Sequence, residues 1–223
     1  MFFADKVILC EGFDEHILRA AAEELFPGEL DRQNVSIVCV EGKDRLIKLA
    51  QLVVKLRMQC FILADFDFLL RDRKKPDGYE TKGHLSVEHL PVEFFAQEHV
   101  AGKDADKYRA EIEALRNKLR KENEKSFYEA KHVSEFDDKT LAATLQVFRS
   151  QGIGILDGEI EHLSKDNAWI NAENKKLNLE RMYELRERLS IGKTMADMFD
   201  LASLREFLRS ILDRKGPAAE PVD

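Results

Sequence analysis

Three short apolar runs, each ending in a polar turn, constrain the fold more than any other feature of this chain. They are residues 6–10 (KVILC), 35–40 (VSIVCV) and 60–64 (CFILA). Apolar runs of this length, bounded by polar turns, are typical of strands that are buried on both faces of a parallel sheet. The sequence therefore predicts an α/β fold built on a parallel sheet.

Two amphipathic helices join these runs. The first begins at Asp14, its expected N-cap, and stops at Pro27-Gly28, and the second covers residues 45–57. Strand, helix, strand, helix and strand form a βαβαβ unit, and right-handed crossovers bring the carboxyl ends of all its strands to one edge of the sheet. Residues that follow the strands are therefore expected to share that edge.

The later sequence divides into a helical part and a return to the sheet. A charged helical stretch at residues 105–131 and a helix at residues 138–149 precede a fourth short strand at residues 153–156, and two further helical stretches lie within residues 177–212. We predict four segments. They are a first core part at 1–100, a helical insertion at 101–150, completion of the core at 151–195, and a carboxyl-terminal helix with a disordered tail at 196–223.

Composition excludes several classes of protein. A formal net charge of -7 argues against a protein that grips nucleic acid by bulk positive charge. The three cysteines, Cys10, Cys39 and Cys60, lie in apolar runs without metal spacing, so we predict buried thiols. No apolar run approaches the roughly 20 residues of a membrane span, and the start lacks signal-peptide features. A cytoplasmic protein without a membrane partner is expected.

Acidic residues collect where the strands end. Glu11 ends the first strand, Glu15 follows one helical turn later, and Asp65 and Asp67 follow the third strand. We expect Asp65 and Asp67 to alternate along an extended segment, which would aim both side chains the same way. Any one such acid is commonly a solvated turn residue or a helix cap. Four at one edge, joined by Glu159 or Glu161 after the fourth strand, are the oxygen ligands that hard divalent cations prefer.

In this order the motifs resemble the Toprim domain of topoisomerases, bacterial primases, recombination proteins and OLD-family (overcoming lysogenization defect) nucleases. The chain most resembles the carboxyl-terminal region of the OLD nucleases, because ADKVILCEGFDE opens it, GIGILDGEIE returns later, and Lys193 follows. The resemblance implies a Rossmann-like Toprim sheet flanked by helices, and DNA cleavage with two Mg2+ or Mn2+ ions. It also implies catalytic roles for Glu11, Asp65 and Lys193, with metal ligands drawn from Glu11, Glu15, Asp65, Asp67, Glu159 and Glu161.

Two departures from the family pattern affect these expectations. OLD proteins carry an amino-terminal ABC-type ATPase domain, and Gly192-Lys193-Thr194 is no Walker A motif because Glu187 stands where its first glycine would be. We therefore expect a carboxyl-terminal fragment of an ATP-dependent nuclease, with the ATPase domain as partner and a dimer formed through it. Glu159 stands where the family usually has aspartate, which leaves open how Glu159 and Glu161 divide between the metals.

Other interpretations stay open at this stage. The basic loop after Asp67, with Arg71, Arg73, Lys74 and Lys75, is either solvated or in contact with DNA phosphates, and Lys193 is likewise either solvated or catalytic. A topoisomerase needs a tyrosine nucleophile and a primase a zinc module, and no motif here indicates either. An Asp-nucleophile phosphatase normally carries its DxD motif after the first strand, whereas here Asp65 and Asp67 follow the third. The remaining alternative is a non-catalytic module for DNA docking or dimerisation.

Overall fold

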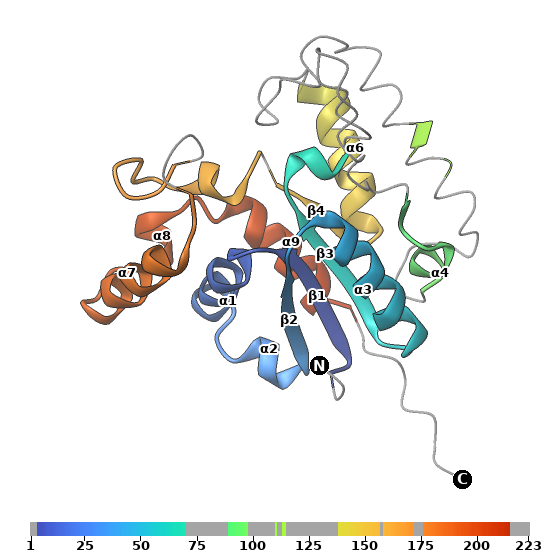
Figure 1. The fold of residues 1–223 in the computed structure, drawn as a ribbon, viewed down its shortest axis with the longest axis horizontal. Helices are drawn as coiled ribbons and strands as arrows, with labels where there is room; N and C mark the ends of the chain where they lie inside the picture. Colours follow the sequence, from blue (N-terminus) through green and yellow to red (C-terminus); the bar gives the residue numbers. More distant parts are fainter. Residues whose placement is uncertain are drawn as a thin grey trace.

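The computed structural model describes residues 4–69, 89–97, 110, 113–114, 138–156, 158–171 and 176–214 (Figure 1). Within these ranges, side chains are described except at residues 43, 44, 67, 69, 138–141, 143 and 144. The basic-loop residues Arg71, Arg73, Lys74 and Lys75 lie outside the described residues, as does the tail from residue 215 onward.

The core is a parallel sheet whose strands are ordered β2-β1-β3-β4. The strands are β1 (Lys6–Glu11), β2 (Val35–Val40), β3 (Gln59–Ala64) and β4 (Ile153–Ile155). Lys6 pairs with Val35 in β2 and with Gln59 in β3, and Ile62 in β3 pairs with Ile153 in β4. The predicted α/β fold with a parallel sheet is confirmed.

Helices cover both faces of the sheet (Figure 1). One face packs against α3 (Lys43–Lys55), α4 (Val92–Phe95) and α6 (Asp138–Ser150), and the other against α1 (Asp14–Leu25) and α9 (Ala202–Leu212). Three shorter or more peripheral helices complete the described fold: α2 (Glu29–Arg32), α7 (Leu179–Ser190) and α8 (Met195–Met198). Two 3-10 helices, η1 (Phe66–Leu69) and η4 (Ile160–Leu163), follow β3 and β4.

The apolar runs are uninterrupted because alternate side chains of a strand pack into the cores on opposite faces of the sheet. Val7 and Leu9 of β1 pack with α3, whereas Ile8 and Cys10 pack with α1 and α9. Gly154 of β4 lies under the Phe207 ring of α9, where a Cβ would stand 2.5 Å from ring carbon Cδ2. A glycine at this position therefore lets α9 lie close against the sheet.

Two sequence-based expectations are wrong, one at the outer strand β2 and one at the start of α1. In the described part of the chain this strand is the outermost one, next to β1, and only Val35 and Ile37 in its first half are fully buried. Cys39 is exposed, contrary to the prediction, although it shares a face of β2 with the buried Val35 and Ile37, whereas Cys10 and Cys60 are buried as expected. Asp14 is also not the N-cap of α1. Phe13 occupies that position, and Asp14 lies buried in the first turn, where its charge is favourable beside the helix amino terminus.

The amino-terminal edge of the sheet is closed by Lys6. Its side chain is 2% exposed. Its ammonium donates to Gln33 Oε1 at 2.7 Å, to the Ile211 carbonyl at 3.0 Å and to the Arg214 carbonyl at 2.7 Å. Burial lowers the pKa of Lys6. These contacts tie the carboxyl end of α9 to the start of β1, where a cation meets the partial negative charge of a helix end.

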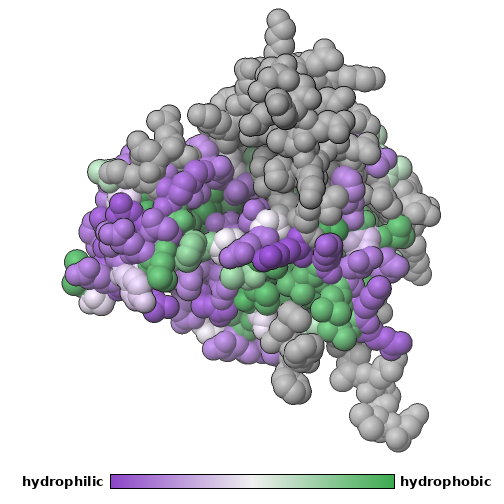
Figure 2. Space-filling model, viewed as in Figure 1, coloured by the Kyte–Doolittle hydropathy of each residue, from purple (hydrophilic) through white to green (hydrophobic). Residues whose placement is uncertain are grey.

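Among the described residues, no helix is both long and apolar enough to span a membrane. On the face drawn in Figure 2, hydrophilic residues gather over α7 and α8. In α7 the charged residues Glu180, Arg186 and Glu187 contribute to this surface, beside the exposed Leu179 and Tyr183.

Candidate functional site

Glu11 and Asp65 lie at the carboxyl ends of neighbouring strands. Glu11 is the last residue of β1, and Asp65 directly follows β3. Leu9 pairs with Ile62, so continuing this register brings Glu11 level with Ala64, the residue before Asp65. The strand order changes direction between β1 and β3, and ligands of open α/β sheets bind in the crevice outside such a switch point. The topology therefore brings these two acids to the sheet position best suited to a ligand.

A tight glycine turn separates Glu11 from α1. Gly12 has a φ of +59°, and its amide donates to the Val40 carbonyl at 2.9 Å. A Cβ at Gly12 would meet nothing within 4 Å, so the backbone conformation, and not crowding, calls for glycine here. Among the described residues, the space next to the Gly12 Cα, one residue after Glu11, is therefore open. Glu15 follows in the first turn of α1, where its carboxylate pairs with Arg19 at 3.2 Å.

The chain turns immediately after Asp65, so the expectation of an extended DFD segment is wrong. The amide of Phe68 donates to the Asp65 carbonyl at 3.0 Å, and Phe66–Leu69 form η1. Burial of Phe66 and Phe68 in the α3-side core accompanies this turn. Asp65 and Asp67 therefore do not share a face by strand alternation. The side chain of Asp67 lies outside the described part of the structure.

The acids that follow β4 also reach this edge. The Phe66 amide donates to the Gly158 carbonyl at 2.8 Å, which places the start of this segment beside Asp65. Glu159 is the N-cap of η4, in reciprocal contact with His162, and its carboxylate pairs with Lys176. Glu161 is 9% exposed and accepts a hydrogen bond from the Leu177 amide at 3.0 Å. Residues 176–177 thus contact both acids that follow β4, Glu159 and Glu161, which we call the returning acids.

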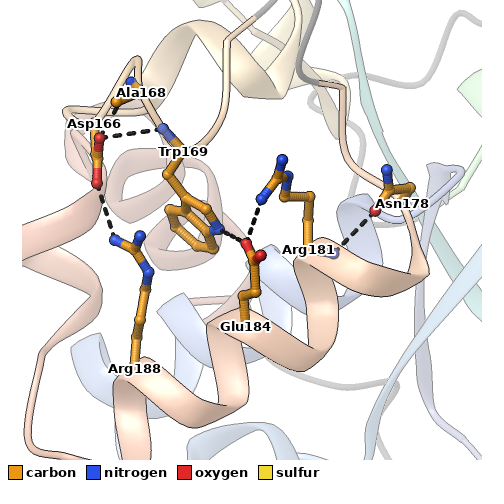
Figure 3. A network of polar contacts seen from close by, with 7 residues as sticks. All are labelled: Asp166, Ala168, Trp169, Asn178, Arg181, Glu184 and Arg188. Atoms are coloured by element: carbon orange, nitrogen blue, oxygen red, sulfur yellow. Dashed lines mark hydrogen bonds and ion pairs between the residues drawn. The ribbon is translucent and has the colours of Figure 1, made fainter.

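A polar clasp holds the next loop against α7 (Figure 3). Asp166 pairs with Arg188 at 2.9 Å, and the Arg188 guanidinium lies 4.3 Å from the centre of the Trp169 ring. The Trp169 indole donates to Glu184, which also pairs with Arg181 at 2.6 Å. Hydrogen bonds from Arg188 and Arg181 hold the pKa values of Asp166 and Glu184, respectively, below their ordinary range. The clasp restrains the loop that begins with Glu159 and Glu161.

Lys193 lies in the exposed turn between α7 and α8. Two residues later, the amides of Met195 and Ala196 donate to Glu24, in the last turn of α1. Glu15 precedes Glu24 by nine residues, which is about 13 Å of helix. The structure therefore ties the Lys193 turn to the end of α1 farther from Glu11 and Asp65. Its catalytic role stays a prediction.

In the described part of the chain, no three or more His, Cys, Asp or Glu side chains form a group that could hold a metal ion. Asp67 and Asp157 do not enter that finding, because the Asp67 side chain and the whole of Asp157 lie outside the described residues. The chemistry of the remaining acids still fits a hard cation, because carboxylate oxygens are its preferred ligands.

Comparison with known proteins supports the resemblance drawn from the motifs. Residues 2–67 match the family described as "Overcoming lysogenization defect protein-like, TOPRIM domain". This match contains Glu11, Glu15, Asp65 and Asp67, and it confirms the Toprim resemblance over these residues. The chain is also 36% identical over 70 residues to "Old nuclease" of Escherichia phage P2. That alignment covers 31% of this chain and 12% of the phage protein. No solved structure matches the chain.

Reasoning from sequence missed Lys176, whose ammonium contacts the predicted metal ligand Glu159. A lysine 17 residues from its partner belongs to no short motif. A signal that could have found it is the KK pair at residues 175–176, which follows the returning acids and precedes the Asn178 N-cap of α7. The Trp169 clasp was missed for the same reason, because it depends on contacts between distant residues.

Proposed function

We propose that this chain takes part in hydrolysing DNA phosphodiester bonds with two Mg2+ or Mn2+ ions held at the carboxyl edge of the sheet. One observation carries the proposal. Glu11 and Asp65 end neighbouring strands at the switch point, inside the segment that matches the OLD-like TOPRIM family. The printed name of the phage relative, a nuclease, agrees with this chemistry.

The candidate metal ligands come from separate elements of the fold. They are Glu11 of β1, Glu15 of α1, Asp65 and Asp67 after β3, and Glu159 and Glu161 at η4. Two bound ions would lower the pKa of an attacking water and stabilise the leaving oxygen. The chain's own contribution is to hold carboxylates on rigid strand ends, so that little reorganisation is needed when a cation and a phosphate arrive.

Basic residues around this edge are proposed to hold the DNA backbone. Arg71, Arg73, Lys74 and Lys75 follow Asp67 by a few residues, so phosphates next to the site are their expected partners. We propose that Lys193 offsets negative charge on the DNA, although its turn is tied to the more distant end of α1. An amino-terminal ABC-type ATPase domain, with a dimer formed through it, is proposed from the family resemblance alone.

A non-catalytic DNA-docking module is the second candidate. The finding that favours it is the lack of a three-carboxylate group among the described side chains. Both candidates predict binding of DNA, but only the first predicts metal-dependent strand cleavage. Cleavage is therefore the property that separates them.

The test compares wild-type protein with Asp65→Asn and Glu41→Gln on supercoiled and linear DNA, in Mg2+, Mn2+, Ca2+ or EDTA. Glu41 is the matched control, because it also follows a strand, β2, but its carboxylate pairs with Arg45 at 3.1 Å and β2 lies away from the switch point between β1 and β3. We expect cleavage in Mg2+ or Mn2+ to fall about 100-fold or more in Asp65→Asn and to persist in Glu41→Gln. Full cleavage by Asp65→Asn would refute the assignment, and DNA binding without cleavage would assign the docking module.

A further inference from the structure

Lys176 lies on one of the carboxylates that the proposed function assigns to a metal ion. Its Nζ pairs with Glu159 Oε2, and the two side chains are 48% and 38% exposed. The next residue, Leu177, donates its amide to Glu161. A single short segment therefore places a cationic group on one returning acid and a neutral donor on the other.

This ion pair belongs to the carboxyl edge of the sheet. Gly158, the neighbour of Glu159, accepts the Phe66 amide next to Asp65. Lys193, by contrast, lies in a turn tied to Glu24 at the other end of α1. Of these two lysines, Lys176 is thus the one that the structure connects directly to the candidate metal ligands.

Anchoring the segment does not require the Lys176 pair. The Leu177 amide already binds Glu161, and Asn178 caps α7 by accepting the Arg181 amide at 2.9 Å. Other pairs nearby, Glu15–Arg19 and Asp166–Arg188, use arginine, whose planar group favours fixed geometry. A lysine ammonium is a point charge on a flexible stem and leaves a half-exposed carboxylate more readily.

We propose that Lys176 competes with the divalent cation for the carboxylate of Glu159 and so sets the metal affinity of the site. This inference rests on the proposed function, because it takes Glu159 as a metal ligand. An ammonium and a divalent cation neutralise the same carboxylate charge, so removing one favours the other. Lys176 released by the cation then lies at the edge where a DNA phosphate would bind.

The test is Mn2+ binding, measured by the electron paramagnetic resonance signal of free Mn2+, with no DNA and no turnover. We compare wild-type protein with Lys176→Gln, and use Lys165→Gln as the matched control. Lys165 is also exposed and close in sequence, but its Nζ donates to the Ala196 carbonyl at 2.7 Å instead of to an acid. Lys176→Gln is expected to bind Mn2+ about 2- to 5-fold more tightly, and Lys165→Gln to match the wild type.

A double-mutant cycle separates competition from a structural role. In a Glu159→Gln background, Lys176→Gln should leave the Mn2+ affinity unchanged, because the contested charge is gone. The fluorescence of Trp169, the single tryptophan, reports whether the neighbouring loop keeps its structure. Unchanged or weaker Mn2+ binding by Lys176→Gln, with wild-type fluorescence, overturns the inference alone. No Mn2+ binding by wild type and Lys176→Gln alike overturns the proposed metal site as well.

Discussion

The amino and carboxyl edges of the sheet, at opposite ends of the same strands, differ in the charge and burial of their residues. At the amino edge, Lys6 of β1 is buried, and its donors reach three acceptors from residues 33, 211 and 214. At the carboxyl edge, the same strand ends in Glu11 next to open space at Gly12, and β3 leads to Asp65. One edge is closed by a buried cation, and the other presents anions.

A strand of six residues thus begins in a buried, hydrogen-bonded cation and ends in an accessible acid. A buried ammonium must be fully hydrogen-bonded, so its surroundings are specific and costly to alter. Acids that are to bind a cation must instead stay accessible, and their mutual repulsion opposes folding. Changes at the amino edge should therefore alter stability, and changes at the carboxyl edge should alter cation binding.

The largest expected effect on stability is that of Lys6→Met. This change leaves buried acceptors at Gln33, Ile211 and Arg214 without their donor. We expect the free energy of unfolding in urea to fall by about 2–4 kcal/mol, with Mn2+ affinity within about twofold of the wild type. Lys48→Met, at an exposed position of α3, is the control. Loss of Mn2+ binding by folded Lys6→Met protein would break the distinction between the edges.

A smaller effect is expected where exposed ion pairs hold the loop near the carboxyl edge. The pKa values of Asp166 and Glu184 are held below their ordinary range, each first of all by a hydrogen bond from an arginine. A carboxyl group whose pKa is lowered in the folded state stabilises the fold at pH values above its ordinary pKa. This contribution is lost as the pH falls through the pKa of the folded state. We therefore expect Trp169 fluorescence to change as the pH falls below the ordinary pKa range of carboxyl groups, before the amino edge of the sheet unfolds.

An Arg188→Gln variant and raised salt concentration test whether the ion pairs cause that fluorescence change. Arg188→Gln should remove the Asp166 part of the transition, and 0.5 M salt should reduce its amplitude because exposed pairs are screened. A fluorescence change centred well above pH 5, or none before global unfolding, would show that the clasp does not hold this loop.

Much of the fold could be predicted because local patterns determine it. The bounds of β2 agree with the sequence prediction, and those of β1 and β3 differ by one residue. Runs buried on two faces are apolar throughout, which makes such strands visible in a single sequence. The exposure of Cys39 was not predictable in this way, because Cys39 continues the same apolar run and shares a face with the buried Val35 and Ile37.

The candidate site was predictable only in part. Topology alone brings Glu11 and Asp65 to one edge, since parallel strands joined by right-handed crossovers share their carboxyl ends. The turn at η1 was missed, because the buried Phe66 and Phe68 fit an extended run equally well. Contacts of Lys176 and of the Lys193 turn join residues far apart in sequence, so no local spacing reveals them. The roles of all these site residues stay predictions.

We propose that Glu11 and Asp65 bind a divalent cation at the switch point. The most direct test is a Mn2+ titration of wild-type protein, Glu11→Gln and Asp65→Asn, with urea unfolding measured on the same samples. We predict that the Mn2+ affinity of each variant falls by about 10-fold or more. The free energy of unfolding in urea should be unchanged or slightly higher. Wild-type Mn2+ affinity in both variants would contradict the account.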